Sequence, residues 1–219
     1  MSLLPSTWPR LTAAQHDQLR AFEAALVQLN RTFNLISRDT EPYVADRHVR
    51  HSLILATRPF PPGVTVVDWG TGGGLPAIPL AIACPHLRVV AVDSVGKKVR
   101  AVQTMARRLG LNNVDAWHGR ALAWPGQAPY SVSRATAPLR DLWTWHARVE
   151  SEPPAPVEAP SADVWPPGLL CLKGGDLTRE IADLHAAFPG LVVEQAPLRP
   201  LLPDPYFAEK VLVTVREAP

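Results

Sequence analysis

The sequence predicts an α/β protein built on a doubly wound, mostly parallel sheet. β-Branched runs alternate with helical patterns along most of its 219 residues, and a glycine-rich turn follows the first of these runs. Hydrophobic residues make up 47% of the chain, enough to bury the core of one domain or of a domain with a small extension. The same composition excludes disordered, collagen-like and coiled-coil chains.

The first part of the chain is predicted to be a helical extension outside the sheet. Apolar residues recur at three- and four-residue steps from Leu19 to Leu29, which is the spacing of an amphipathic helix. Thr12 is suited to cap the start of this helix, and Asn30 to end it. Three prolines and a glycine at residues 59–63 then mark a boundary. We therefore expect an N-terminal helical extension over residues 1–60 and a second domain over residues 61–219.

A strand, a glycine turn and a helix follow this boundary. The β-branched run Val64–Trp69 predicts the first strand, which leads into Gly70–Gly74 and a helix-compatible stretch up to Ala83. The second strand is predicted at Arg88–Asp93, and a helix with an apolar stripe at Gly96–Leu109. Further strands are predicted over residues 114–118, 130–134, 169–173, 191–195 and 210–216, and further helices over 139–149 and 177–187.

Two segments near the C-terminus have distinctive compositions. Residues 150–167 contain six prolines and no glycine, so we expect a surface loop rather than a regular element. The last strand is apolar at almost every position from Val211 to Val215, which predicts a place inside the sheet with partners on both sides.

Charge is distributed unevenly along the chain. Residues 1–149 carry 17 Lys and Arg against nine Asp and Glu, a net charge of +8, whereas residues 150–219 carry −6. This asymmetry favours an anionic partner for the first part. No apolar run approaches the roughly 20 residues of a membrane-spanning helix, and the N-terminus lacks a signal-peptide pattern, so we expect a cytoplasmic protein without a membrane partner. Cys84 and Cys171 lie in apolar runs without metal-ligand spacing, which predicts buried thiols and no metal site.

The glycine turn and the next strand predict a nucleoside-binding site. Gly70, Gly72 and Gly74 follow the first strand, but Leu75 stands where a dinucleotide fingerprint requires its third glycine. The turn also lacks the lysine of a phosphate-binding loop, and no nucleophile elbow occurs. Asp93, at the end of the second strand, is placed to accept both hydroxyls of a ribose. Together these features resemble the S-adenosylmethionine loop of class I methyltransferases.

Six stretches of the chain, in order and spacing, form one recognisable set. They are Phe33-Asn34-Leu35, Arg50-His51, Val67 to Pro79, Asp93 to Arg100, Ser133-Arg134-Ala135 and Leu172-Lys173-Gly174. With these stretches the chain resembles, from about Phe33 to Val215, the RsmG (GidB) family of bacterial 16S ribosomal RNA guanine-N7 methyltransferases. It departs from the family at Ile54 and Leu55, where an Asp-Ser pair is usual, and at Leu122, which replaces an acid.

The resemblance implies a Rossmann-like class I fold, S-adenosyl-L-methionine as cofactor, and methyl transfer to N7 of one guanosine in 16S ribosomal RNA of the small ribosomal subunit. The candidate cofactor contacts are Gly70, Gly72, Gly74, Leu75, Asp93, Ser94, Ala121, Leu122 and Arg134. The candidate catalytic residues are Arg134, Lys173, Asn34 and His51, and the candidate RNA contacts are Arg47, Arg50, Lys97, Arg100 and Lys173.

The residues at the predicted active-site edge agree with this chemistry. Guanine N7 has a free lone pair, so its methylation requires no general base. Amino-group methylation commonly uses an Asn/Asp-Pro-Pro-aromatic motif and cytosine-C5 methylation a cysteine, whereas Ser133-Arg134-Ala135 stands at that strand end. Arg134 offers a planar fork for a carboxylate or a phosphate, and Lys173 is expected to project into the cleft. Trp69, Trp143 and Trp145 are expected in the core or in the cleft wall.

Two other functions are compatible with the same residues. One is a non-catalytic RNA-binding or ribosome-assembly factor on this fold, and the other is a small-molecule methyltransferase. We expect a monomer whose segment around Arg47 and His51 covers the cleft, with both residues on one helix face.

Overall fold

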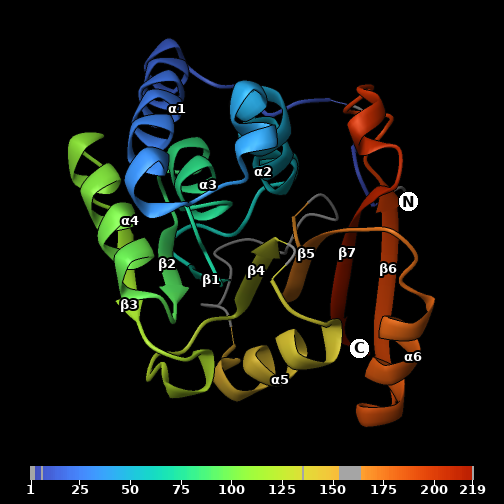
Figure 1. Cartoon of the computed structure of the whole chain (residues 1–219). Coiled ribbons are helices and arrows are strands. Elements are labelled where there is room, and N and C mark those ends of the chain that lie inside the picture. Colours follow the sequence, from blue (N-terminus) through green and yellow to red (C-terminus); the bar gives the residue numbers. More distant parts are fainter. Residues whose placement is uncertain (1–2, 6, 135, 153–163, 219) are drawn as a thin grey trace.

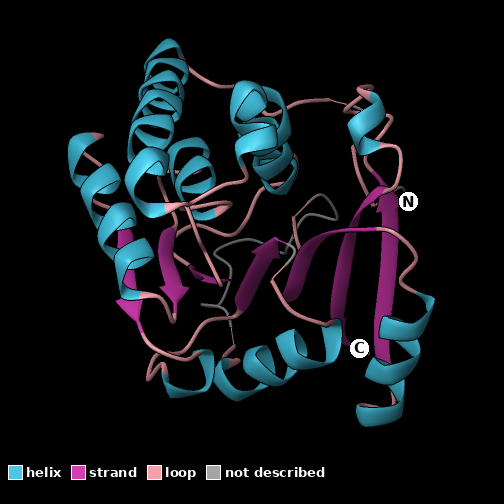
Figure 2. Ribbon diagram, in the orientation of Figure 1, coloured by secondary structure: helices cyan, strands magenta, loops and turns pink. Residues whose placement is uncertain are grey.

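The computed structural model describes residues 3–5, 7–134, 136–152 and 164–218 and shows a seven-stranded sheet between two layers of helices (Figures 1 and 2). The strands are β1 (Thr65–Trp69), β2 (Arg88–Asp93), β3 (Val114–His118), β4 (Tyr130–Arg134), β5 (Gly168–Gly174), β6 (Leu191–Pro197) and β7 (Lys210–Glu217). The α-helices are α1 (Ala13–Phe33), α2 (His51–Leu53), α3 (Ala77–Ala83), α4 (Gly96–Arg108), α5 (Leu139–Val149) and α6 (Thr178–Ala187). Shorter 3₁₀ or π turns are η1 (Arg38–Tyr43), η2 (Val44–Arg50), η3 (Ile54–Ala56), η4 (Ala121–Ala123) and η5 (Pro205–Phe207).

The strand order confirms the predicted doubly wound sheet. It runs β3-β2-β1-β4-β5-β7-β6, with parallel pairing from β3 to β5 and with β7 antiparallel to both of its neighbours. β7 is paired on both edges and buried from Leu212 to Val215, which confirms the position inside the sheet that its largely apolar sequence predicts. The chain leaves β1 toward β2 and later returns to β4 on the other side, so a topological switch point lies between β1 and β4.

Each face of the sheet has its own hydrophobic core. Val66 and Val132 point into a core shared with α1, α3 and α4, whereas Val67 and Val213 point into a second core shared with α5 and α6. This division follows from the two-residue period of strands, in which successive side chains face opposite sides. Figure 1 shows the corresponding layers, with α1, α3 and α4 on one side of the sheet and α5 and α6 on the other.

The first helix begins as predicted but ends later. Thr12 forms a capping box with Gln15, since each side chain accepts the backbone N–H of the other. The predicted end at Asn30 is wrong: the helix continues to Phe33, and Asn34 is the left-handed C-cap. Asn30 is instead buried, and its Oδ1 accepts the N–H groups of residues 35 and 36 at 2.7 and 2.9 Å. It therefore holds the chain that leaves the helix.

The N-terminal segment shares a core with the sheet. Phe22 and Leu26 of α1 are fully buried, as are Ile54 and Leu55 of η3. The two positions at which the chain departs from the family's Asp-Ser pair are thus apolar core positions here. The predicted domain boundary at residue 60 stays a prediction. Side chains from both sides of it pack in the same core.

Most of the proline-rich loop lies outside the described residues, but its C-terminal end is not on the surface. Trp165 is 1% exposed and donates its Nε1–H to the Leu55 carbonyl at 2.8 Å. Its own carbonyl accepts the Tyr130 hydroxyl at 2.9 Å. The expectation of a surface loop over 150–167 is therefore wrong for Trp165, because an indole buries a large apolar area once its N–H has a partner.

The two cysteines are buried, as predicted, and burial raises the pKa of each thiol to about 12. Among the described helices, none has the length and apolar composition needed to cross a lipid bilayer.

Replacing Trp165 by Phe should lower the free energy of unfolding by ~1–3 kcal/mol, because the buried Leu55 carbonyl would lose its donor. Urea denaturation of the two proteins measures the difference. Trp117→Phe is the control at a half-buried position and should change stability by about 0.5 kcal/mol or less. Equal effects of both substitutions would contradict an anchoring role for Trp165.

Candidate active site

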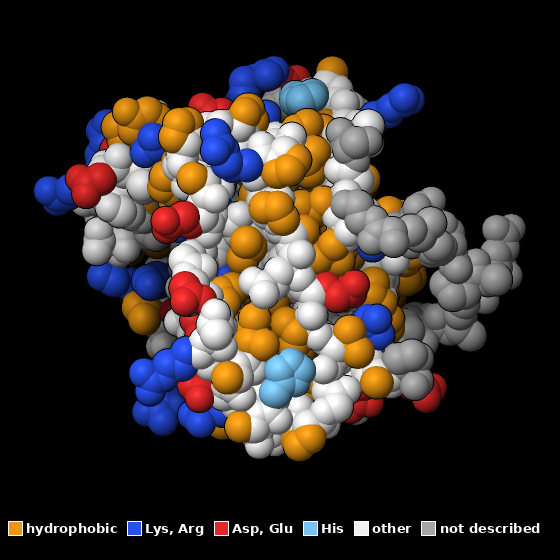
Figure 3. Space-filling model, turned by 90° about the vertical axis from the view of Figure 1, so that its right-hand side faces the viewer, with side chains coloured by type: hydrophobic (Ala, Val, Ile, Leu, Met, Phe, Trp, Pro, Cys, Tyr) orange, Lys and Arg blue, Asp and Glu red, His pale blue; other side chains and the backbone are white. Residues whose placement is uncertain are grey.

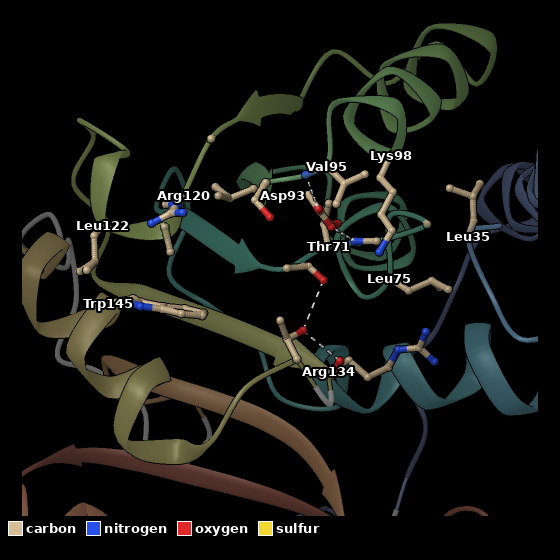
Figure 4. A pocket seen from close by; sticks show the side chains of 18 residues that line it. Leu35, Thr71, Leu75, Asp93, Val95, Lys98, Arg120, Leu122, Arg134 and Trp145 are labelled. Atoms are coloured by element: carbon tan, nitrogen blue, oxygen red, sulfur yellow. Dashed lines mark hydrogen bonds between the residues drawn. The ribbon is translucent and has the colours of Figure 1, made fainter. Parts of the chain in front are cut away.

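A cavity of about 660 Å³ opens where β1, β2 and β4 end, beside the switch point. Open α/β sheets bind their ligands at this place, and the volume is typical of small-molecule sites. Figure 4 shows its walls, which come from the loop after β1, the end of β2, α4, η4 and α5. The residues that line it are Leu35, Gly70, Thr71, Gly72, Gly73, Leu75, Val92, Asp93, Ser94, Val95, Lys98, Gly119, Arg120, Ala121, Leu122, Arg134, Thr136 and Trp145.

The glycines after β1 provide space rather than free N–H donors. Gly70 donates its N–H to the Val92 carbonyl, and Gly72 donates to Asp93, so both amides are satisfied inside the protein. Both glycines have positive φ values, +72° and +57°. A Cβ on Gly70 would lie 2.0 Å from a Thr136 methyl carbon, whereas one on Gly72 would meet no atom closer than 3.9 Å and would stand in the cavity region.

Gly74 does not line this cavity. With φ at +80°, a Cβ there would lie 2.7 Å from Ile78 Cδ1, so this glycine allows α3 to pack closely behind the loop. Its expected contact with a cofactor is therefore corrected to a packing role. Leu75, by contrast, does line the cavity.

Asp93 ties together two walls of the cavity. Its Oδ2 accepts the N–H of Gly72 at 2.9 Å, and its Oδ1 accepts the N–H of Val95 at 2.8 Å. Each carboxylate oxygen has two lone pairs, so each keeps one position free to accept a hydroxyl. The carboxylate therefore lies where the sequence places it, fixed in orientation and still able to bind a diol; the contact with a ribose itself stays a prediction.

Apolar side chains and one lysine complete the wall. Val95 and Leu122 are 37% and 50% exposed, unusual for large apolar residues, and both border the cavity. The Trp145 ring faces the same space and packs edge-on against Trp69, so it is a cleft-wall residue as expected. From α4 it is Lys98 that reaches the cavity. Sequence reasoning missed it, because a helix period alone cannot show which lysine of a pair lies over the strand end.

Arg134, at the end of β4, reaches η2 of the N-terminal segment; the described residues of η1 and η2 do not line the cavity, so the expected cover over the cleft stays a prediction. Its Nη1 donates to Nδ1 of His48 at 2.8 Å, and His48 Nε2 lies 2.8 Å from Thr40 Oγ1. Because a guanidinium can only donate, Nδ1 must accept and the imidazole proton sits on Nε2. Burial, with the charges of Arg134 and Arg47, lowers the pKa of His48 to about 3, so this ring is neutral. Burial also lowers the pKa of Arg134, to about 10, and the guanidinium keeps its charge at neutral pH.

Three residues predicted to be catalytic lie elsewhere. Lys173 is buried, and its Nζ donates to the Ala137 carbonyl at 2.6 Å and to Glu180 Oε2 at 2.7 Å, so it does not project into the cavity. Asn34 is the exposed cap of α1. His51 is 4% exposed and packs against the Phe207 ring, and it is His48, one turn earlier, that touches Arg134. Spacing along the chain could not separate two histidines in an irregular run of π and 3₁₀ turns.

The predicted RNA contacts occupy two surfaces. Lys97 and Arg100 are exposed on α4 and do not line the cavity. Arg50 is exposed and lies 3.5 Å from an Asp46 oxygen. Arg47 is half-buried, with its guanidinium 4.7 Å from the Tyr206 ring centroid. Arg47 and His51 contact the neighbouring residues Tyr206 and Phe207, so the predicted common face is confirmed.

Comparisons with known proteins agree on one family. A family profile described as GidB, rRNA small subunit methyltransferase G, matches residues 15–152. The chain is 57% identical over 212 residues to the Ribosomal RNA small subunit methyltransferase G of Salinibacter ruber, covering 96% of this chain and 97% of that protein. It is 41% identical over 195 residues to the protein of the same name from Chlorobaculum tepidum, covering 85% and 82%.

A solved structure shares the fold. The geranyl diphosphate C-methyltransferase of Streptomyces coelicolor, crystallised with Mg²⁺, geranyl diphosphate and S-adenosyl-L-homocysteine, superposes with a TM-score of 0.58 over 94% of this chain and 99% of that one. At 15% sequence identity this likeness concerns the architecture alone.

Asp68, in β1 behind the loop, should make stability depend on pH. Burial raises the pKa of its carboxyl to about 7 from an ordinary value of 3.8. Between those values the folded state binds this proton more tightly than the unfolded state, so Asp68 contributes a slope in which stability falls as pH rises from about 4 to about 7, by at most ~1.4 kcal/mol per pH unit. His48, whose lowered pKa gives a slope of opposite sign over part of this range, is common to wild type and variant, so the Asp68 slope is the difference between the two proteins. Urea unfolding at several pH values should show that Asp68→Asn removes this slope.

Asp183→Asn, at an exposed position on α6, is the matched control and should leave the slope unchanged. An identical pH profile for wild type and Asp68→Asn would contradict the assignment.

Proposed function

The chain belongs to the GidB family of rRNA small subunit methyltransferases G, and from this premise we propose that it transfers a methyl group from S-adenosyl-L-methionine to N7 of one guanosine in 16S ribosomal RNA. The observation that carries the proposal is the Asp93 carboxylate, which is fixed by Gly72 and Val95 and keeps one acceptor position on each oxygen inside a cavity of fitting volume. The enzyme class, the fold and the cofactor follow from the family.

The residues of the cavity fit S-adenosyl-L-methionine in three respects. Asp93 can accept two ribose hydroxyls, and the exposed apolar groups of Val95 and Leu122 suit the two faces of a purine. Gly72 lets a ligand lie against the main chain, since a Cβ there would meet no atom closer than 3.9 Å, whereas the Thr136 side chain packs against Gly70. Arg134 keeps its charge and can pair with the carboxylate of a methionyl group. When bound, the cofactor supplies a methyl group on an electrophilic sulfonium.

Positioning is the catalytic contribution of this chain. Guanine N7 attacks with a lone pair that is already free, so no side chain has to remove a proton. His48 is neutral and is used to hold Arg134, which agrees with a site that needs orientation rather than a base. Correct placement of the reacting atoms alone is worth up to roughly 7–11 kcal/mol in favourable intramolecular systems.

We propose the small ribosomal subunit as the partner, with a monomeric enzyme acting in the cytoplasm. The N-terminal part carries the excess of positive charge, and Lys98 and Arg120 place two cations at the cavity itself. Figure 3 views the side of β6 and α6, on which lysines and arginines gather at the left and upper edges while apolar side chains occupy the middle. The middle of this face, over β6, therefore offers few cations to RNA phosphates, so we place the RNA-binding surface on another side of the molecule.

Roles of the remaining candidates stay predictions. These are cofactor contacts from Leu75, Ser94 and the Ala121–Leu122 backbone, and RNA contacts from Arg50, Lys97 and Arg100.

Gly72→Asp should abolish cofactor binding, because the new carboxylate would stand in the cavity next to Asp93. Calorimetric titration with S-adenosyl-L-methionine measures this. Gly63→Asp is a matched control, since Gly63 also has positive φ (+74°) and open space around it but does not line the cavity. Equal affinities of both variants for S-adenosyl-L-methionine would contradict the assignment of this cavity as the cofactor site.

Arg134→Gln should slow methyl transfer roughly 10- to 100-fold, the loss expected when a charged hydrogen-bonding group of ~1.5–3 kcal/mol is removed. Tritiated S-adenosyl-L-methionine with undermethylated small subunits provides the assay, and Arg140→Gln on the exposed side of α5 should retain the wild-type rate.

The wild-type enzyme in the same assay also separates the alternatives. Labelled RNA supports the proposal. Salt-sensitive RNA binding without label would favour an assembly factor, and label only in a metabolite extract would favour a small-molecule methyltransferase.

A further inference from the structure

A cationic cluster lies around Tyr206, next to the cofactor cavity but outside its walls. We call Arg47, Tyr206 and Lys210 the Tyr206 cluster. The Arg47 guanidinium lies 4.7 Å from the Tyr206 ring centroid, and Lys210 Nζ lies 5.4 Å from it. All three side chains are half-buried, so they are held in place and still reach solvent.

The fold assembles this cluster from two distant parts of the chain, residues 44–50 and 205–210, at the carboxyl edge of the sheet. Arg47 comes from η2, Tyr206 from η5, and Lys210 begins β7 opposite Gly174, the last residue of β5. The Lys210 amine lies over that residue, since a Cβ on Gly174 would be 2.8 Å from Nζ. A single strand, β5, separates Lys210 on β7 from Arg134 on β4.

In the described part of the chain, the charges of this cluster have no carboxylate partner. Neither Arg47 nor Lys210, nor the nearby Arg134, lies within 4.0 Å of an acidic oxygen of the described residues. Lys173, on the same edge of the sheet, is by contrast neutralised by Glu180. An uncompensated group of cations favours an anionic ligand.

Buried polar nitrogens in and beside the cluster also lack partners among the described residues. Arg47 Nε and both ring nitrogens of His51 are buried without a hydrogen bond. His51 packs on Phe207, whose ring lies 5.0 Å from that of Tyr206. Burial lowers the pKa of His51 well below its ordinary value, and the charges of Arg134 and Lys210 lower it further. Buried polar groups in native proteins normally have partners, so these point to a ligand that the described chain does not supply.

An exposed aromatic ring adjoins the cluster and indicates the kind of anion. Tyr43 is 46% exposed, and the Arg47 guanidinium lies 3.9 Å from its ring centroid. Cations combined with a solvent-facing aromatic ring are typical of surfaces that bind single-stranded nucleic acid, where phosphates meet the cations and a base stacks on the ring.

We propose that the Tyr206 cluster binds the backbone phosphates that flank the acceptor guanosine in the RNA chain. This inference rests on the proposed function and adds a substrate subsite to it. Arg134 would then connect the two sites, since it borders the cofactor cavity and also lowers the pKa of His51 beside the cluster.

The test compares guanosine 3′,5′-bisphosphate, which carries both flanking phosphates, with guanosine. Each compound is added stepwise to protein saturated with S-adenosyl-L-homocysteine, and the dissociation constant is obtained from the shifts of the protein's NMR signals. The wild-type protein should bind the bisphosphate at least tenfold more tightly than the nucleoside. Lys210→Gln and Arg47→Gln should each remove most of that preference, while Arg47→Lys should retain a large part of it because it keeps the charge.

Arg216→Gln is the matched control, since Arg216 lies on the same strand as Lys210 but at its opposite end. Thermal melting and cofactor titration verify that each variant is folded and has an intact cofactor site.

Equal binding of bisphosphate and nucleoside by the wild type, or an equal loss in Arg216→Gln, would overturn the proposal. So would competition by inorganic phosphate as strong as that by the bisphosphate, which would indicate a site for free phosphate. Methyl transfer by the wild type to small subunits is measured in parallel, so failure of this subsite and failure of the proposed function give different results.

Discussion

The Asp93 carboxylate fixes the shape of the cavity at the switch point, because it accepts hydrogen bonds both from the loop after β1 and from the chain that enters α4. A buried carboxylate must be satisfied by donors, and two backbone N–H groups supply them here. The N–H groups of Gly70 and Gly72 are used within the protein, and Gly72 leaves bare main chain open to a ligand, whereas Gly70 and Gly74 allow close packing of Thr136 and Ile78. Shape, rather than a row of free N–H donors, is what this turn contributes.

A second constraint is the pairing of lysines with carboxylates at the carboxyl edge of the sheet, which decides which lysines can meet an anionic substrate. Lys173 and Lys210 both stand at the carboxyl edge of the sheet, on strands that are hydrogen-bonded to each other. Glu180 neutralises the first, whereas no described carboxylate approaches the second. A lysine close to a strand end is therefore available to a substrate only if no helix has placed an acid beside it.

The N-terminal segment is structurally continuous with the walls of the cavity. It shares the core of α3 and α4, contributes Leu35 to the cavity wall, and supplies the His48 that orients Arg134. The irregular turns of residues 38–56 direct His48 toward Arg134 and Arg47 toward Tyr206. A regular helix would place these side chains differently, since their directions depend on the local turn type.

The order of strands and helices, the position of the glycine turn and the place of Asp93 could all be predicted from the sequence, because they depend on local periodicity and on the topology that such an order permits. The family resemblance added the cofactor and the reaction. Which histidine meets Arg134, which lysine of α4 reaches the cavity and which cations lack a counter-charge were decided only by the tertiary structure. These properties depend on pairs such as Lys173 with Glu180 or His48 with Arg134, whose members are brought together by packing between elements. The residue pattern of one segment does not predict which side chains of another segment will pack beside it.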